Sequence, residues 1–318
     1  MKTFALVDLA PENSTTVRSL FIRAAGAALA GIGIRLAPRW IARTTARRFI
    51  TPPRSSRQGE ETPFLQSGRH HAIQNADGSL ACWRFGPSGS PAVIFSHGWG
   101  GRGSQGEAFV PALLAAGFQV WLFDQPGHGG SDGRQATIVD FAASIGHVAR
   151  LIESEGGTLA GLIGHSFGAS ALALAISREL KTRPELRVVL IAPPASLTAY
   201  SHFFAKRLGL PEILRSAMQY RLEQRIGLRW DEVELLSLAP RLKQAALFIH
   251  DEGDREVPFA NSRLASEAWP GATLWPTGGL GHRRILRAGE VVDRSVSFLR
   301  GDMPASLEPP PPFPAPIY

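Results

Sequence analysis

Short apolar runs recur along most of the chain, separated by longer stretches with apolar residues at helical spacing. The runs at 92–96, 119–123, 159–163, 187–191, 246–250 and 272–275 predict buried strands. Helices are expected at 106–116, 137–153, 260–268 and 283–300, and directly after the run that ends at 163. Residues 72–74 and 80–85 flank an Asn-Ala-Asp-Gly turn and predict a hairpin. We therefore expect an α/β fold with a mostly parallel sheet and helices on both faces.

One segment, 195–242, interrupts this alternation. Its pattern is helical, it lies between two predicted strands, and it contains Tyr200, Phe203, Phe204 and Trp230. Ligands of α/β proteins bind at the carboxyl edge of the sheet. We interpret the segment as a small helical cap inserted over that edge, and an ordinary long crossover connection is the alternative.

The pattern predicts four parts. Residues 1–57 form a basic helical extension, which begins with a loosely attached segment (1–16) and carries two helical segments divided by Pro38. The α/β core comprises 58–194 and 243–301, entered through a Pro/Arg/Ser linker at 51–68, and the cap is 195–242. A proline-rich tail, 302–318, lies outside the fold.

Positive charge is concentrated in the extension. The net charge is +7, and no acidic residue occurs between Glu12 and Glu60. Removing the nine arginines of this interval leaves −2 for the rest of the chain, so we expect no nucleic-acid partner. These arginines are Arg18, Arg23, Arg35, Arg39, Arg43, Arg47, Arg48, Arg54 and Arg57.

Four of these arginines recur at helical spacing and form a ridge, with apolar side chains beside it. The ridge is Arg35, Arg39, Arg43 and Arg47, and its apolar neighbours are Leu36, Trp40 and Ile41. Such a helix either lies on an anionic membrane surface or packs on the domain with its arginines in water. The apolar run at 24–34 is shorter than the about 20 residues of a membrane span. We expect a cytoplasmic protein, with membrane association and an organelle transit peptide as open alternatives.

Cysteine and histidine usage narrows the chemistry. The single Cys82 excludes an intramolecular disulfide and a cysteine-rich zinc site. The nine histidines include no H-E-x-x-H or comparable ligand spacing. We therefore expect neither a metal nor an organic cofactor.

A glycine-rich segment, 101–106, matches the dinucleotide-binding pattern G-x-G-x-x-G, and Asp124 ends the next predicted strand. In that motif the first glycine comes directly off the strand, whereas here residues 97–100 intervene. This alternative also gives no role to the serine motif described next, so we favour the latter.

The run 159–163 stops at Gly164-His165-Ser166-Phe167-Gly168, and a helical pattern follows at once. A strand, a sharp turn with serine at its apex and a helix form a nucleophile elbow. Glycines two residues on either side of Ser166 allow the close chain approach that such a turn requires. We predict that Ser166 is a nucleophile.

A serine hydroxyl needs a base within hydrogen-bond reach and an acid that orients the base. His282 follows the last predicted strand in a glycine-rich loop and is the candidate base. Asp254 follows the preceding strand and is the preferred acid, with Asp251 as the alternative. We assign His165 a packing role on the other side of the elbow.

The negative charge that develops on a substrate carbonyl requires two N–H donors. One is the backbone N–H of Phe167, the residue after the nucleophile. The second is expected from the loop after the strand 92–96, where the N–H of Trp99 is the candidate.

Taken together, these motifs resemble those of the α/β-hydrolase-fold serine hydrolases. The matching segments are His97-Gly98-Trp99, 123–131, 164–168, Asp254 with Val257-Pro258, and Gly281-His282, in family order across most of the chain. The resemblance implies an esterase-like enzyme with the triad Ser166, Asp254 and His282, and a structural role for Asp124. It also implies a small-molecule acyl substrate, which the aromatic cap suggests is partly apolar. Acyl transfer by the same triad and a non-catalytic ligand-binding protein are the alternatives.

Overall fold

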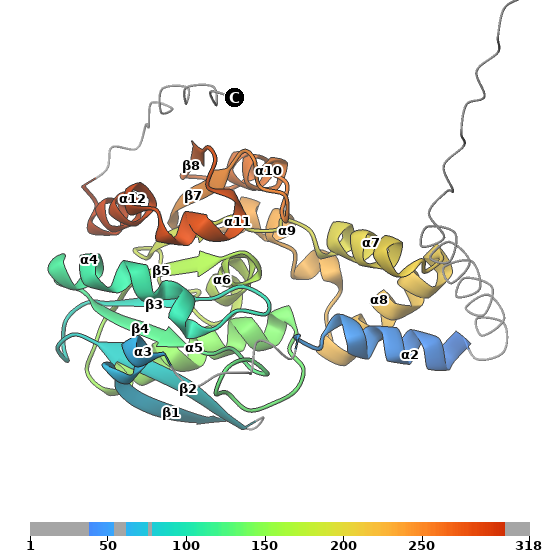
Figure 1. Ribbon diagram of the computed structural model, residues 1–318, viewed down its shortest axis with the longest axis horizontal. Coiled ribbons are helices and arrows are strands. Elements are labelled where there is room, and N and C mark those ends of the chain that lie inside the picture. Colours follow the sequence, from blue (N-terminus) through green and yellow to red (C-terminus); the bar gives the residue numbers. More distant parts are fainter. Residues whose placement is uncertain (1–37, 54–61, 76–77, 303–318) are drawn as a thin grey trace, which may run out of the picture.

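The computed structural model describes residues 38–53, 62–75 and 78–302. Within them a single eight-stranded sheet has the order β1-β2-β4-β3-β5-β6-β7-β8 (Figure 1). β1 pairs antiparallel with β2, β2 pairs antiparallel with β4, and the other neighbours are parallel. The predicted mostly parallel α/β sheet is confirmed. The strands are β1 Arg69–Asn75, β2 Gly78–Phe85, β3 Ala92–Ser96, β4 Gln119–Phe123, β5 Leu159–His165, β6 Arg187–Ile191, β7 Ala245–Asp251 and β8 Ala272–Thr277.

Helices cover both faces of this sheet because successive strand residues point to opposite sides. Ile94, Leu162 and Val188 belong to one apolar cluster, together with α5, α6, α9 and α10. Val93, Ile163 and Val189 belong to a second, together with η2, α4, η5 and α12. The helices are η2 Gly103–Phe109, α4 Val110–Ala115, α5 Ile138–Ser154, α6 Phe167–Arg178, α9 Leu235–Leu238, α10 Ala260–Ala268, α11 Gly281–Arg284, η5 Ile285–Arg287 and α12 Gly289–Arg300.

Two local expectations differ from the structure. The predicted linker at 51–68 contains a short helix, α3 Pro63–Gln66, whose first turn is capped by the Thr62 hydroxyl. Leu65 of α3 is buried in the second cluster, which explains why this polar-looking segment is ordered against the sheet. The single helix predicted at 283–300 is divided into α11, η5 and α12.

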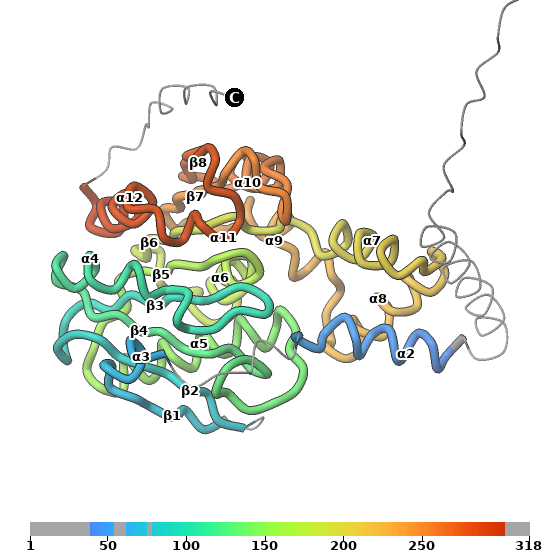
Figure 2. Tube along the Cα trace, in the orientation of Figure 1, coloured from blue at the N-terminus to red at the C-terminus, as the bar shows by residue number. Residues whose placement is uncertain are grey.

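Between β6 and β7 the chain leaves the sheet and forms two helices beside it, α7 Leu197–Leu208 and α8 Glu212–Ile226 (Figure 2). Gly209 and Gly227 end these helices in the left-handed conformation, which a glycine adopts without steric cost. The chain returns through η3 Trp230–Glu232, α9 and η4 Ala239–Arg241. We call the segment from α7 to η3 the cap helices.

The helix α2, Pro38–Phe49, packs against α8 of the cap helices although α8 begins more than 160 residues later in the sequence (Figure 1). Ala46 and Ile50 join Met218, Leu222 and Trp230 in a third apolar cluster. Arg39, Arg43 and Arg47 are exposed on α2, and Trp40 is 66% exposed. In the described part of the chain, α2 therefore packs on the domain and keeps its arginines in water.

Several expectations concern residues outside the described ranges. These are the loosely attached start, the first helical segment of the extension, Arg35 and Leu36 of the ridge, and the proline-rich tail after 302. Within the described ranges, no helix is both long enough and apolar enough to cross a bilayer.

Candidate active site

Ser166 stands at the junction between β5 and α6. Its backbone has φ 52° and ψ −125°, a conformation that L-residues rarely adopt. The N–H of Ser166 donates to the carbonyl of Ile191 on β6, 2.8 Å away, and its own carbonyl accepts from Ala169 and Ser170 in α6. These bonds hold the strained turn between strand and helix and leave the serine partly exposed.

Glycine is required at both positions that flank this turn, because any side chain there would collide with neighbouring backbone atoms. A Cβ at position 164 would lie 2.6 Å from the Cα of Ala169. A Cβ at position 168 would lie 2.2 Å from the carbonyl oxygen of His97. Because both neighbours are backbone atoms, a side chain at either position would force the elbow apart.

The structure brings Asp254 and His282 together from loops after β7 and β8. Nδ1 of His282 lies 2.6 Å from Oδ2 of Asp254, and both side chains are buried. A carboxylate can only accept, so Nδ1 carries the proton and Nε2 holds the free lone pair. The hydroxyl of Ser166 makes no hydrogen bond to His282 or to any other described residue.

Asp254 is held by four donors. Its Oδ1 accepts from the backbone N–H groups of Glu256 and Val257. Its Oδ2 lies 3.2 Å from Nε2 of His250, in addition to its contact with Nδ1 of His282. Burial by itself would raise the pKa of Asp254, but the bonds from His250, His282 and Val257 outweigh it and lower the pKa well below its usual value. Asp254 is therefore a carboxylate throughout the neutral pH range.

Asp251, the alternative acid, does not contact His282. Its Oδ1 accepts from the N–H of Gly253, and its Oδ2 accepts from the Thr277 hydroxyl and from the N–H of Leu280, 2.8 Å away. Asp251 thus ties the loop that carries Asp254 to the loop that carries His282. The structure brings Asp254, the preferred residue, to the histidine.

His165 is buried and packs, as expected, but it contacts His282 directly and so does not lie on the other side of the elbow. Nε2 of His165 donates to the backbone carbonyl of His282 at 2.9 Å, and the two ring centroids are 4.7 Å apart. Burial lowers the pKa of His165 to about 3, with a smaller contribution from the nearby His282. His165 is therefore neutral, and it joins the elbow to the loop of His282.

The loop with the predicted donor Trp99 is fixed by another buried histidine. Nε2 of His97 accepts from the N–H of Gln125, and Nδ1 donates to the carbonyl of Gly98 at 2.8 Å. The indole of Trp99 packs edge-on against Phe167, with ring centroids 5.5 Å apart. Phe167 is the first residue of α6, so its N–H has no acceptor within the helix. Both predicted donor residues therefore lie beside Ser166.

The dinucleotide interpretation fails on Asp124. This carboxylate is buried, and it accepts from the N–H of Gly103 and of Gly130, each at 2.7 Å. It therefore closes a turn inside the protein and is not available to a ribose. The N–H of Gly103, which that motif would direct at a phosphate, is already engaged.

A pocket of about 340 Å³ opens beside Ser166. Its walls come from three regions: the elbow and its neighbouring loops, the cap helices, and the end of α2. Its apolar lining includes Trp99, Ile138, Phe167, Leu197, Tyr200, Leu222, Ile226, Trp230 and Leu235, and α2 and the residues after it add Phe49, Ile50 and Pro53. Glu256 and Arg283 also line it and are joined by a bidentate ion pair.

Sequence patterns did not indicate the roles of His250, His97 or the end of α2. His250 occupies an interior strand position, where nothing but the structure places it against Asp254. Phe49 and Ile50 lie in the basic extension, where the sequence pattern indicated an arginine ridge and gave no sign of a pocket wall. Ser166, in contrast, was indicated by its glycine spacing together with the strand pattern before it and the helix pattern after it.

Comparison with known proteins defines the family. A model described as "Alpha/beta hydrolase family" matches residues 93–294, more than half of the chain. The chain belongs to the alpha/beta hydrolase family. The matched range contains Ser166, Asp254 and His282.

Relatives of this alpha/beta hydrolase include esterase-like proteins. Human monoglyceride lipase is 34% identical over 152 residues, covering 43% of this chain and 49% of the lipase, so the match spans about half of that relative. Among solved structures, the esterase Pf2001 of Pyrococcus furiosus is 23% identical, with 79% of this chain and 98% of that chain covered and a TM-score of 0.57. Est1E of Butyrivibrio proteoclasticus, solved with ferulic acid bound, is 18% identical, with 73% and 97% covered and a TM-score of 0.57.

Proposed function

We propose that this alpha/beta hydrolase is a serine esterase that cleaves small carboxylic esters through Ser166, His282 and Asp254. The observation that carries the proposal is the 2.6 Å contact between Nδ1 of His282 and Asp254, in a site that also holds a strained, partly exposed serine. That contact leaves Nε2 of His282 as the only ring nitrogen able to accept a proton.

In the first half of the reaction, Oγ of Ser166 attacks the ester carbonyl carbon while Nε2 of His282 takes the hydroxyl proton. The carbonyl oxygen becomes an oxyanion and accepts from the N–H groups of Trp99 and Phe167. The C–O bond to the alcohol then breaks, His282 returns the proton to the leaving oxygen, and an acyl-enzyme remains. In the second half a water molecule repeats these steps and releases the acid. Substrate binding shortens the distance from Ser166 to His282, since such contacts are often long without substrate.

Pocket size and lining support a small, partly apolar substrate. The volume of about 340 Å³ is near the lower end of the roughly 300–1,000 Å³ typical of ligand sites. Aromatic and aliphatic side chains form most of its walls, so burial of an apolar group supplies the binding free energy. We therefore expect short acyl esters to be better substrates than long ones.

The test combines a fluorophosphonate probe with a chain-length series of p-nitrophenyl esters. The wild type should be labelled at Ser166 and should hydrolyse short esters, and Ser166→Ala should lose labelling and about 10⁵-fold in kcat. Ser170→Ala is the matched control: Ser170 lines the same pocket, but its hydroxyl donates to the carbonyl of Pro194. It should keep labelling and most activity.

A folded wild type that reacts with neither the probe nor any ester would contradict the proposal and favour a ligand-binding protein. Product analysis in the presence of added alcohols or thiols separates hydrolysis from acyl transfer by the same triad. Free acid as the main product is the outcome we expect.

A further inference from the structure

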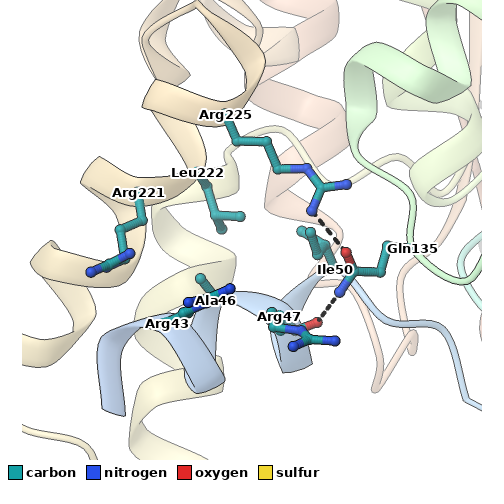
Figure 3. Close-up of a pocket in the computed structure, with 8 residues that line it drawn as sticks. All are labelled: Arg43, Ala46, Arg47, Ile50, Gln135, Arg221, Leu222 and Arg225. Carbon is teal, nitrogen blue, oxygen red and sulfur yellow. Dashed lines mark hydrogen bonds between the residues drawn. The ribbon is translucent and has the colours of Figure 1, made fainter. Parts of the chain in front are cut away.

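A second hollow adjoins the ester pocket at the α2–cap contact, where Ile50 and Leu222 line both. It has a volume of about 290 Å³ and is bounded by α2, α8 and Gln135 (Figure 3). Four arginines line it in two pairs, Arg43 with Arg47 on α2 and Arg221 with Arg225 on α8. The remaining lining is Ala46, Ile50, Leu222 and the amide of Gln135, and no carboxylate contributes to it.

These four arginines differ from another arginine of α8, Arg215. In the part of the chain that the structure describes, none of the four forms an ion pair, whereas Arg215, also on α8, pairs with Glu212 at 2.7 Å. Each pair is spaced i,i+4, which places like charges side by side on one helix face and destabilises the helix. The two pairs also border the same hollow between α2 and α8, so their charges add there. A bound anion would remove this unfavourable term.

One of the four side chains is already held in place. Nη1 of Arg225 donates to Oε1 of Gln135 at 2.8 Å, and Nε2 of Gln135 donates to the backbone carbonyl of Arg47 at 3.4 Å (Figure 3). Gln135 thus links α8 to the end of α2. A guanidinium has five N–H donors, and this bond uses one of those of Arg225.

We propose that this hollow binds a phosphate group. Arginine matches phosphate oxygens with paired donors, and a phosphate monoester carries about two negative charges and three strong acceptors. A single carboxylate would leave more of the four positive charges uncompensated. The phosphate belongs either to a soluble phosphate compound or to an anionic lipid headgroup, and the recognition chemistry is the same.

Occupancy of this site acts on the ester pocket through shared side chains. Ile50 and Leu222 line the arginine hollow and the pocket beside Ser166. A phosphate held by both arginine pairs joins α2 to α8 and so holds Phe49 and Ile50, which form one wall of the ester pocket. This inference concerns binding and does not depend on the proposed esterase activity.

Binding is measured on the full chain by calorimetry with inorganic phosphate and glycerol 3-phosphate. In a second arm, the protein is sedimented with phosphatidylcholine vesicles that contain or lack phosphatidic acid. The double variant Arg221→Gln/Arg225→Gln should bind at least about tenfold more weakly in the arm where the wild type binds. Arg221→Lys/Arg225→Lys should fall between the two, because charge is kept but paired donors are lost.

Arg178→Gln/Lys181→Gln is the matched control. It removes two exposed cations, at and just beyond the end of α6 remote from Ser166, that form no ion pair within the described ranges, and it should bind like the wild type. Binding in solution identifies a soluble phosphate compound as the ligand, and binding only to phosphatidic acid vesicles identifies a headgroup. Absence of binding in both arms, or an equal loss in the control, would overturn the proposal.

Thermal unfolding separates binding from a purely structural role. Without phosphate, Arg221→Gln/Arg225→Gln should melt at or above the wild-type temperature, because repulsion is relieved. The ligand found in the first experiment should raise Tm for the wild type and not for this variant. A variant that melts below the wild type without ligand would show that the arginines serve stability, and the proposal would fail.

Discussion

Two parts of this protein are held together in different ways. One is the loop edge, the loops after β7 and β8 that carry Asp254 and His282, and the other is the contact between α2 and the cap helices. At the loop edge, directional hydrogen bonds fix the side chains: Asp254 and Asp251 have several donors each, and His165 bonds to the backbone of His282. At the α2–cap contact, the attraction is apolar packing around Met218 and Trp230, and the arginines at its margin form no ion pair with any residue that the structure describes. The first region holds the candidate catalytic side chains in place, and the second contributes Ile50, Leu222 and Trp230 to the wall of the pocket.

Asp254→Asn tests this difference most strongly. The amide disfavours the Nδ1–H tautomer of His282, so we expect kcat for a short ester to fall about 10⁴-fold while KM changes little. Steady-state kinetics over a pH series measures it.

Asp251→Asn is the control for that variant, because Asp251 bonds to both loops but not to His282. It should lower stability and reduce kcat far less than Asp254→Asn. Equal losses of kcat in the two variants would show that the hydrogen-bonded loops, and not the acid itself, are what the reaction needs.

Met218→Ala tests the packed region. Met218 is fully buried in the third cluster and does not line the ester pocket, so its truncation loosens α2 from the cap. We expect about 2–5 kcal/mol less stability, measured by urea unfolding, together with a raised KM and a nearly unchanged kcat.

Leu113→Ala is the matched variant in α4, also fully buried but in the second cluster. It should lose similar stability and leave KM unchanged. If KM rose equally in both variants, general loosening rather than the α2–cap contact would determine pocket shape.

His165→Gln tests the hydrogen-bonded region through pH. The unfolded chain protonates His165 near pH 6.5, but burial holds the folded pKa at about 3, so folding stability falls as the pH drops through this window. From pH 6.5 to 4.5 this group should cost about 2 kcal/mol, which His165→Gln should remove from the pH dependence. Urea unfolding at the two pH values measures it. His202→Gln, at an exposed position, should keep the wild-type slope, and a wild-type slope in His165→Gln would contradict the proposed burial effect.

Much of the fold followed from local pattern. The runs at 92–96, 119–123 and 187–191 became strands with the predicted ends, because apolar strand residues buried on both faces leave a continuous signal. The elbow at Ser166 was equally visible, since its turn requires glycine at two fixed positions. The sequence pattern did not predict the division of the last helix or the short helix α3, because both depend on which side chains contact the sheet.

The residues of the candidate site could be predicted from local sequence pattern only in part. Asp254 and Asp251 were both candidates, and their distances to His282 separate them: one carboxylate touches the imidazole, and the other bonds to Leu280. His250 and His165 gave no distinguishing signal, because a histidine in an apolar run has the same pattern whether it packs or bonds. The partner of His165 comes from a loop 117 residues away, whereas His250 meets Asp254 only four residues on, through the turn that follows β7.

The sequence by itself determined the alternation of strands and helices, the strained serine turn and the order of the chemical groups, since these depend on neighbours within a few residues. Tertiary structure alone decided that α2 closes one wall of the pocket and that arginines from two distant helices face one hollow. Helical periodicity reports which side of a helix is apolar. It cannot report what that side meets, because the partner is chosen by the packing of the whole chain.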